Sequence, residues 1–344
     1  MIKLIKLFSL ISISCFLLST ARKQQTLDLP IEKSFNISGT AQGTTYSIKY
    51  INQDSIIAKT EIDSILDEID TSLSLYINTS RISQFNASSK GVLADHHMKN
   101  VVEKSIEFNL LSKGYFDITS KPLSDLWGFG FKSVNNPPTE KKIKNTLQYV
   151  GVNMLYFKND SLLKRSPNTQ IDCNGIAQGY SVDVLCDFLK SKKLNNFIVE
   201  LGGEIKTSGS NLMGKPWIVG IENPGNFKGN DFLVDKKIAV SNFAVTTSGS
   251  YGKFKKYGTK YVTHIMNPLT GKPMNSEIIS VTVIAKTAMQ ADALDNVFAL
   301  LGIHDSFELV KQLPETGLHI LYRHQSGEVR DTSNHFFKEH LVAN

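Results

Sequence analysis

The chain has 344 residues, enough for one large domain or two ordinary ones, and either arrangement can bury a sizeable core. Hydrophobic residues make up 41% and charged residues 20% of the sequence, which excludes a disordered or repetitive chain. The formal net charge of +6 comes from scattered lysines, with one cluster over 253–260 that we interpret as a solvated face. This distribution predicts no nucleic-acid partner.

Residues 1–21 have the pattern of an export signal peptide. Two lysines precede an apolar run over 7–18, and the small residues 19–21 resemble a cleavage site. The run is too short to span a membrane comfortably. Cys15 leaves a second interpretation open, in which the chain is a lipoprotein. Both alternatives predict the cell envelope, in the periplasm or at the periplasmic face of the inner membrane, with membrane association through a lipid or signal anchor.

The first half of the chain then alternates between periodic segments and polar or aromatic loops. Residues 44–51 alternate as a strand does, after a turn at Gly39 and Gly43. Apolar spacing predicts helices over 62–73, 101–111 and 139–149. The loop over 114–130 is rich in aromatic residues and glycine. It can either wall a flat ligand or form a satellite core.

The histidine pair at Asp95-His96-His97 is a candidate metal site on residue type alone. We set it aside for two reasons. The surrounding sequence is typical of a loop, and adjacent side chains are not expected to share one face of a helix or strand.

The second half of the chain reads as strands with two helices. The first helix follows a glycine-containing stretch, Ile171 to Asp183, with the sequence IDCNGIAQGYSVD. Such a loop can hold a phosphate at a helix N-terminus, although it can equally be a tight turn. Residues 246–249 suggest another phosphate-facing turn. The other predicted elements are a helix over 290–301 and strands at 154–158, before Asp172, and at 196–201, 217–221, 238–245, 261–266, 278–285 and 318–322.

Two cysteines of the expected mature chain, Cys173 and Cys186, lie on either side of this loop and its helix. No C-x-x-C motif occurs, so a thiolate metal site is not expected. They are interpreted as two buried small residues, with a disulfide as the alternative.

Eight collinear motifs resemble the ApbE family, the FAD:protein FMN transferases. The resemblance runs from about Gly43 to Gly302. The motifs are GTTYSI, SLYINTSRISQFN, GYFDITSKPLSDLWGFG, IDCNGIAQGYSVD, VELGGEI, AVTTSGSY, THIMNPLTGKP and ADALDNVFALLG.

The resemblance implies binding of FAD and Mg²⁺ and transfer of the FMN half of FAD to a threonine or serine of an acceptor flavoprotein, with release of AMP. It implies a T-fold-like α+β core of mainly antiparallel sheet. It also implies a signal peptide over 1–21, a linker over 22–38 and a transferase domain over 39–344. The implied FAD contacts are Gln42, Tyr76, Tyr115, Phe116, Asp117, Asp172, Gln178 and Ile265. The implied metal ligands are the Gly175 carbonyl, Asp292 and Asn296, with Asp295 as a further candidate.

Elementary chemistry is compatible with this ligand set. Mg²⁺ prefers oxygen ligands and keeps positions for water and phosphates. Asp292 and Asn296 are four residues apart, so one helix face presents both. Asp295 can either contribute to the site or face solvent. His264 is the candidate for a base, or for a phosphate contact.

Four residues depart from the usual family pattern. Gln42 stands where methionine is common, Gln178 where lysine or glutamate is frequent, Asn267 where aspartate is expected and Asn296 where threonine is usual. Three of these substitutions, at Gln178, Asn267 and Asn296, leave a non-catalytic FAD-binding protein of the envelope as an alternative function. An Mg²⁺-dependent FAD pyrophosphatase that yields FMN and AMP is a further alternative, because it needs the same ion and the same ligand.

Overall fold

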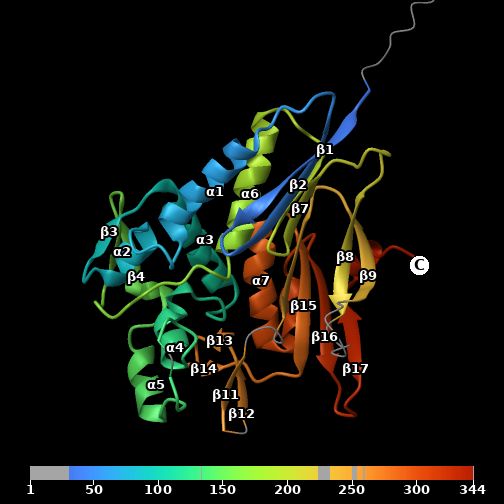
Figure 1. Cartoon of the computed structure of the whole chain (residues 1–344). Helices are drawn as coiled ribbons and strands as arrows, with labels where there is room; N and C mark the ends of the chain where they lie inside the picture. Colours follow the sequence, from blue (N-terminus) through green and yellow to red (C-terminus); the bar gives the residue numbers. More distant parts are fainter. Residues whose placement is uncertain (1–30, 133, 224–232, 250–253, 259, 344) are drawn as a thin grey trace, which may run out of the picture. The chain divides into compact units, whose positions relative to one another are not determined.

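The computed structural model describes residues 31–132, 134–223, 233–249, 254–258 and 260–343 (Figure 1). The expected leader over 1–21 therefore lies outside the described residues. Among the described helices, none is both long and apolar enough to cross a membrane. Residues from Glu32 onward form one compact unit.

An eight-stranded antiparallel sheet is the centre of this unit, which confirms the expected α+β class with mainly antiparallel strands. Its strands follow the order β1-β2-β6-β7-β10-β15-β16-β17. Their bounds are β1 Lys33–Ala41, β2 Thr44–Asn52, β6 Phe197–Leu201, β7 Glu204–Ser208, β10 Ala244–Gly249, β15 Ile278–Ala285, β16 Gly317–Arg323 and β17 Val329–Ser333.

Helices cover one face of this sheet and a hairpin covers the other (Figure 1). On the helical face, α1 (Lys59–Leu73), α6 (Ala177–Ser191), α7 (Ala288–Leu301) and α8 (Ile303–Val310) pack on a shared apolar core. On the opposite face lie β8 (Trp217–Asn223), β9 (Leu233–Val240) and α9 (His335–Glu339). Alternation along the strands explains both cores, because Ala244 faces the helices and Val245 faces the hairpin.

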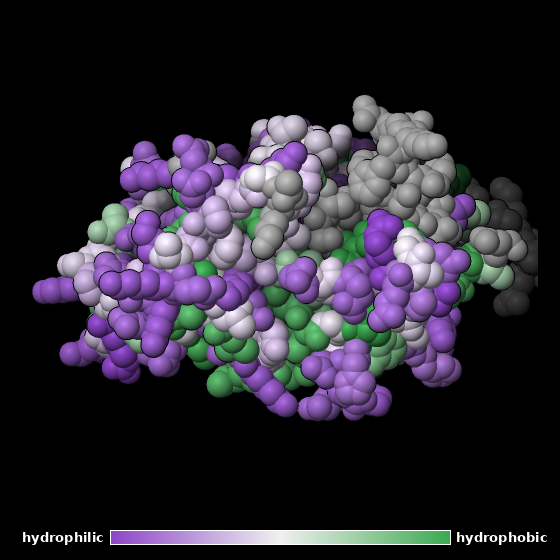
Figure 2. All heavy atoms as spheres, turned by 90° about the horizontal axis from the view of Figure 1, so that it is seen from below, coloured by the Kyte–Doolittle hydropathy of each residue, from purple (hydrophilic) through white to green (hydrophobic). Residues whose placement is uncertain are grey.

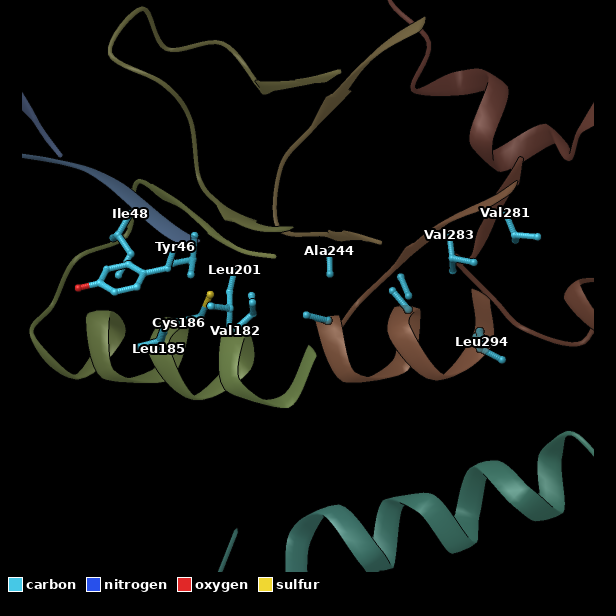
Figure 3. Close-up of a cluster of buried hydrophobic side chains, with 14 of the residues drawn as sticks. Tyr46, Ile48, Val182, Leu185, Cys186, Leu201, Ala244, Val281, Val283 and Leu294 are labelled. Atoms are coloured by element: carbon cyan, nitrogen blue, oxygen red, sulfur yellow. The ribbon is translucent and has the colours of Figure 1, made fainter. Parts of the chain in front are cut away.

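Figure 3 shows how α6 and α7 lie in one row on the same side of the strands. Val182, Leu185 and Cys186 come from α6, and Leu294 comes from α7; all four are at most 1% exposed. Tyr46 and Ile48 of β2 belong to the same core. The two helices are therefore fixed against one sheet by a shared core.

Two further cores lie beside the sheet. One joins α2 (Arg81–Ala87), α3 (His96–Leu111) and the small sheet of β3 (Gly91–Leu93), β4 (Leu155–Lys158) and β5 (Ser161–Lys164) to residues of α1, α6 and α7. The other involves α4 (Lys121–Leu126), α5 (Glu140–Leu147), β11 (Phe254–Tyr257), β12 (Lys260–Thr263) and β13 (Met266–Asn267). The remaining described elements are η1 (Ile118–Ser120), η2 (Val152–Met154) and β14 (Lys272–Pro273).

Several predicted boundaries differ from the structure for local reasons. Gly39 lies inside β1, and the turn is formed by Gln42 and Gly43, which both have positive φ. β1 starts at Lys33, within the segment expected to be a linker over 22–38. The single strand expected over 238–245 is the end of β9 and the start of β10.

The turn expected over 246–249 is wrong, because these residues lie in β10 and pair with β15. The strand expected directly before Asp172 is also wrong, because β5 ends at Lys164. Cys173 and Cys186 are free thiols, which confirms the interpretation as buried residues.

Candidate functional site

The glycine-containing stretch is anchored where it leaves the small sheet. The Asn86 side chain binds the Ile171 backbone at both ends, since its amide donates to the carbonyl at 2.8 Å and its oxygen accepts from the N–H at 2.7 Å. The Asp172 N–H donates to the Ile118 carbonyl at 2.8 Å. These bonds connect the loop to α2 and to the aromatic motif. α6 then begins at Ala177, as the sequence predicted a helix here.

Gly179 brings the start of α6 into direct contact with α7. Its N–H donates to Asp292 Oδ2 at 3.0 Å. A Cβ placed on Gly179 would lie 2.4 Å from the Ala288 carbonyl oxygen and 2.9 Å from the Asp292 Cβ. Only glycine permits this approach of the two helices. The structure therefore brings the glycine loop and Asp292 together, although 113 residues separate them in the chain.

The Asp183 carboxylate binds the N-terminus of α7, the helix that Gly179 contacts. Its two carboxylate oxygens accept from the N–H groups of Ala288 and Met289 at 3.0 and 2.9 Å. Lys206 Nζ donates to the same carboxylate at 2.5 Å. An acidic group at a helix N-terminus is favourable because the helix dipole is positive there. Sequence reasoning assigned no role to Asp183, since its partners come from distant segments.

Three carboxylates gather beside this contact, those of Asp292, Asp295 and Glu204. Asp292 is 4% and Asp295 2% exposed. Burial raises the pKa of Asp292 to about 7, with a further contribution from the charge of Asp183. Burial and then the charge of Asp292 raise the pKa of both Asp295 and Glu204. Asp295 also accepts from Thr246 Oγ1 at 2.8 Å, so the alternative that it faces solvent is wrong.

This carboxylate group has the chemistry of a site for a hard cation. Within the described residues, none of the three carboxylates forms an ion pair with a lysine, arginine or histidine. The Glu204 Oε2 atom is buried without a hydrogen-bond partner. Buried acids that repel each other are costly unless a cation or protons compensate their charge. Oxygen-rich donors of this kind fit Mg²⁺.

Asn296 and Gly175 lie beside the same group. A Cβ on Gly175 would lie 3.4 Å from Asn296 Nδ2 and 3.9 Å from Phe116 Cε2. The Asn296 amide donates to Asp295 Oδ1 at 3.0 Å, and its oxygen accepts from Ser248 Oγ at 3.2 Å. The metal ligands implied by the family resemblance therefore meet at the start of α6.

Two glutamines lie near this group, one at the β1–β2 turn and one beside the turn between β6 and β7. Gln42, at the β1–β2 turn, donates from its side-chain amide to Ser181 Oγ of α6 at 2.8 Å. A Cβ on Gly202 would lie 2.8 Å from Gln178 Nε2 and 3.4 Å from Glu204 Oε2. The side chains of Gln178 and Glu204 therefore both lie close to Gly202. The signal that points to Glu204 is an acidic residue directly after two glycines at a strand end.

The aromatic motif is made of buried and half-buried residues. Phe116 is 7% and Asp117 9% exposed. Asp117 accepts from the Thr119 N–H at 2.8 Å and from the Asn109 side chain at 3.2 Å, and burial raises its pKa. Trp127 lies in a satellite core and donates to the Gly271 carbonyl at 2.8 Å. The satellite-core interpretation of this loop is therefore confirmed for Trp127, and the interpretation of the loop as a ligand wall stays a prediction.

The other implied FAD contacts lie in loops around the aromatic motif. Tyr76 is 76% exposed, and its ring meets that of Phe131 edge-on at 5.6 Å. Ile265 is buried, and its carbonyl accepts from the Met274 N–H at 2.7 Å. His264 packs near the Phe129 ring, with centroids 6.5 Å apart. A built Cβ on Gly114 would lie 2.9 Å from Leu269, so the loop after His264 adjoins the aromatic motif.

The surface at the end with α5 and the β11–β12 hairpin is mixed. Figure 2 shows hydrophilic side chains over much of this face with apolar ones gathered between them. The hairpin contributes an exposed aromatic pair, Phe254 and Tyr261, with centroids 5.3 Å apart.

Together, the fold and the site define an α+β domain in which a glycine loop and buried oxygen ligands form a candidate cation site. The ApbE family model matches residues 42–320. The chain belongs to the ApbE family.

Relatives with assigned names cover most of the chain. A protein of Vibrio cholerae serotype O1, named FAD:protein FMN transferase, is 37% identical over 275 residues, which are 78% of this chain and 81% of the relative. A protein of the same name from Escherichia coli K12 is 30% identical over 74% of each chain.

Solved structures agree with this assignment. The flavin transferase ApbE from Vibrio cholerae superposes with a TM-score of 0.79 at 32% identity, over 90% of this chain and 100% of that chain. The apo form of the Pseudomonas stutzeri flavinyl transferase ApbE gives 0.80 at 29% identity, over 91% and 98%.

Proposed function

We propose that this chain is an enzyme that transfers the FMN half of FAD to a threonine or serine hydroxyl of an acceptor flavoprotein, with release of AMP. The names of the relatives, at up to 37% identity over most of the chain, support flavin transfer. The structural observation that carries the proposal is the contact between Gly179 and Asp292. It brings a phosphate-binding type of loop to a group of buried carboxylates.

Mg²⁺ is the cation that we propose for this site. The Gly175 carbonyl, Asp292 and Asn296 would hold it, with Asp295 as a further ligand. When bound, it would neutralise negative charge on the FAD pyrophosphate. We propose that the Glu204 carboxylate contributes negative charge to the site of the cation, because it interacts electrostatically with Asp292 and its Oε2 atom has no hydrogen-bond partner.

FAD would be held by residues of the glycine loop, the β1–β2 turn and the loops around the aromatic motif. We propose that Gln42, Tyr76, Tyr115, Phe116, Asp117, Asp172, Gln178 and Ile265 hold the flavin and adenine parts. The exposed ring of Tyr76 supplies a face for stacking on a planar ring system. Asp117 already uses its carboxylate within its own loop, so its proposed contribution is to fix the backbone next to Phe116.

The transfer requires an acceptor hydroxyl to attack the phosphorus of the FMN half. A new P–O bond forms to the hydroxyl oxygen, and the bond from that phosphorus to the bridging oxygen breaks, so that AMP leaves with the electron pair. The hydroxyl proton needs a base, for which we propose His264. Positioning and charge neutralisation supply most of the rate enhancement in such a reaction.

The test is flavinylation of a purified acceptor that carries a D-x-x-[ST]-G-[AS]-T segment. The acceptor is incubated with the protein, FAD and Mg²⁺, then analysed by mass spectrometry and in-gel fluorescence. We expect a mass increase by one FMN and an equal amount of AMP. An acceptor in which the threonine is replaced by alanine is the control. An acceptor of unchanged mass would overturn the proposal.

Two outcomes would identify the alternative functions. Equal FMN and AMP without an acceptor would indicate a pyrophosphatase, and bound but intact FAD would indicate a carrier. The Asp292→Asn variant keeps an acceptor for the Gly179 N–H and removes the charge. We expect it to fold normally, as judged by circular dichroism, and to lose Mg²⁺-dependent transfer.

We further propose that the transferase domain is exported to the cell envelope. The pattern of residues 1–21 supports a signal peptide with cleavage after Ala21, and Cys15 keeps lipid attachment as the alternative. The ordered domain includes β1, so the linker that we propose ends before Lys33.

A further inference from the structure

A second group of potential metal ligands lies away from the glycine loop, where α1 meets the start of α3. It consists of Glu68, His96 and His97, whose ligand atoms all lie within 4.8 Å of one another. The sequence predicts that the histidines lie in a loop. This prediction is wrong, because α3 begins at His96. In the first turn of the helix their rings tilt together, with centroids 3.8 Å apart.

His97 presents one buried ring nitrogen, Nε2, that could bind a metal. The residue is 4% exposed, and its Nε2 atom is buried without a hydrogen-bond partner. The nearest carboxylate oxygen, of Glu68, is 3.7 Å away. A buried ring nitrogen without a partner is costly, and a bound cation would remove that cost.

The other nitrogen of His97 has the support that metal-bound histidines usually have. Its Nδ1 is hydrogen-bonded to the Tyr180 hydroxyl at 2.7 Å. Such a partner orients the imidazole and lets Nε2 present its lone pair. Burial, followed by the neighbouring His96, lowers the pKa of His97, and this direction favours the neutral ring that a metal ligand requires.

Hydrogen bonds of Asp95, the residue before His96, join the two helices that carry these ligands. Asp95 accepts from the Met98 N–H at 2.8 Å and caps α3. The same oxygen accepts from Ser72 Oγ of α1 at 2.7 Å. The positions of the three ligands are thus set by the fold, while the exposed side chains of Glu68 and His96 leave an entry path from solvent.

We propose that Glu68, His96 and His97 bind a divalent transition-metal cation of the Zn²⁺ type. Two imidazoles and one carboxylate are typical ligands of Zn²⁺, whereas Mg²⁺ prefers oxygen alone. The bound ion joins α1 to α3. Through Tyr180 it also connects to α6, the helix that follows the glycine loop. The site is independent of flavin transfer.

The test is a calorimetric titration of the untagged protein with Zn²⁺ in excess Mg²⁺, which occupies the oxygen-rich site. We expect one equivalent of Zn²⁺ to bind and to raise the Tm. The variants His96→Ala and Glu68→Gln change exposed residues, so they should fold, yet each should lose this equivalent and the Tm increase. Asp292→Asn should retain both. Co²⁺ should give visible absorption bands that disappear in His96→Ala.

Matched controls are His304→Ala and Asp67→Asn, which change exposed residues of the same types outside this group. Both should bind Zn²⁺ as the unchanged protein does. Equal loss in His304→Ala, or retention of the full equivalent in His96→Ala and Glu68→Gln, would overturn the proposal. Binding without a plateau at one equivalent would also overturn it. Flavin transfer by His96→Ala, measured in parallel, should be unchanged.

Discussion

Lys164 shows how burial alters the chemistry of a single side chain. It ends β5, is 6% exposed and donates from Nζ to the Thr169 carbonyl at 2.8 Å. Its ammonium also lies 4.8 Å from the centre of the Phe85 ring. Burial lowers its pKa to about 8 from the ordinary 10.5. The folded state therefore loses this proton at a lower pH than the unfolded chain does.

This shift predicts a pH-dependent contribution to stability. Between pH 8 and 10.5 the unfolded chain keeps a proton that the folded chain has released, so raising the pH favours folding through this residue. We expect the free energy of unfolding of the unchanged protein, minus that of Lys164→Met, to increase between pH 7 and 9. This difference in the free energy of unfolding should increase by at most about 1.4 kcal/mol per pH unit, the value for one proton.

Urea unfolding of both proteins at several pH values measures this difference. The comparison is needed because the pKa values of Cys173 and Cys186 are raised by burial and contribute with the opposite sign. A difference that does not change with pH would contradict the prediction.

At the scale of elements, the approach of α6 to α7 depends on Gly179. Alanine normally stabilises a helix interior over glycine by about 0.5–1 kcal/mol. Here the new Cβ would meet the backbone of Ala288 at 2.4 Å, so the helices would have to separate.

We expect Gly179→Ala to lower stability, because overpacking typically costs about 1–3 kcal/mol. It should also weaken flavin transfer, because the hydrogen bond to Asp292 would be displaced. Gly175→Ala is the matched control for stability, since its Cβ would meet its nearest neighbour at 3.4 Å. Thermal unfolding of both variants measures the effect. An unchanged Tm in Gly179→Ala would show that the helices can adjust.

Periodicity in the sequence was sufficient for the elements with one clearly buried face. The predicted strand over 278–285 coincides with β15, and the helix over 290–301 differs from α7 by two residues. β1 was missed because Ser38, Gly39 and Thr40 look like a turn, although pairing with β2 makes them a strand. Local sequence carries no information on such tertiary pairing.

The candidate site was predictable only in part for the same reason. Family motifs identified Asp292 and Asn296, and their spacing on one helix agrees with the structure. The Gly202-Gly203-Glu204 sequence draws attention to Glu204, but its contribution depends on how β7 packs against α6 and α7, which local sequence does not determine. The meeting of Glu68 with the histidine pair likewise requires the packing of α1 on α3.

At the scale of the whole molecule, β1 protects the edge of the large sheet. It pairs with β2 from Lys33 to Ala41, and Phe35 stacks on Tyr50 with centroids 5.4 Å apart. Without β1, the backbone of β2 would become an exposed edge, and exposed edges promote aggregation.

We expect a chain that begins at residue 39 to have a lower Tm and to aggregate more than one that begins at residue 32. Light scattering and calorimetry at equal concentration measure both effects. The result would be contradicted if the two chains behaved alike, which would mean that β1 adds nothing to the sheet.

α7 contributes side chains to two cores at once, Leu294 to the core under the large sheet and Val297 to the one beside it. Asp292 and Asp295 belong to the same helix. The positions of the two acids therefore depend on packing in both cores, which are the two halves of the interior that α7 contacts. During evolution, a volume change in one half can displace these acids unless the other half compensates, so the two halves are constrained to diverge together.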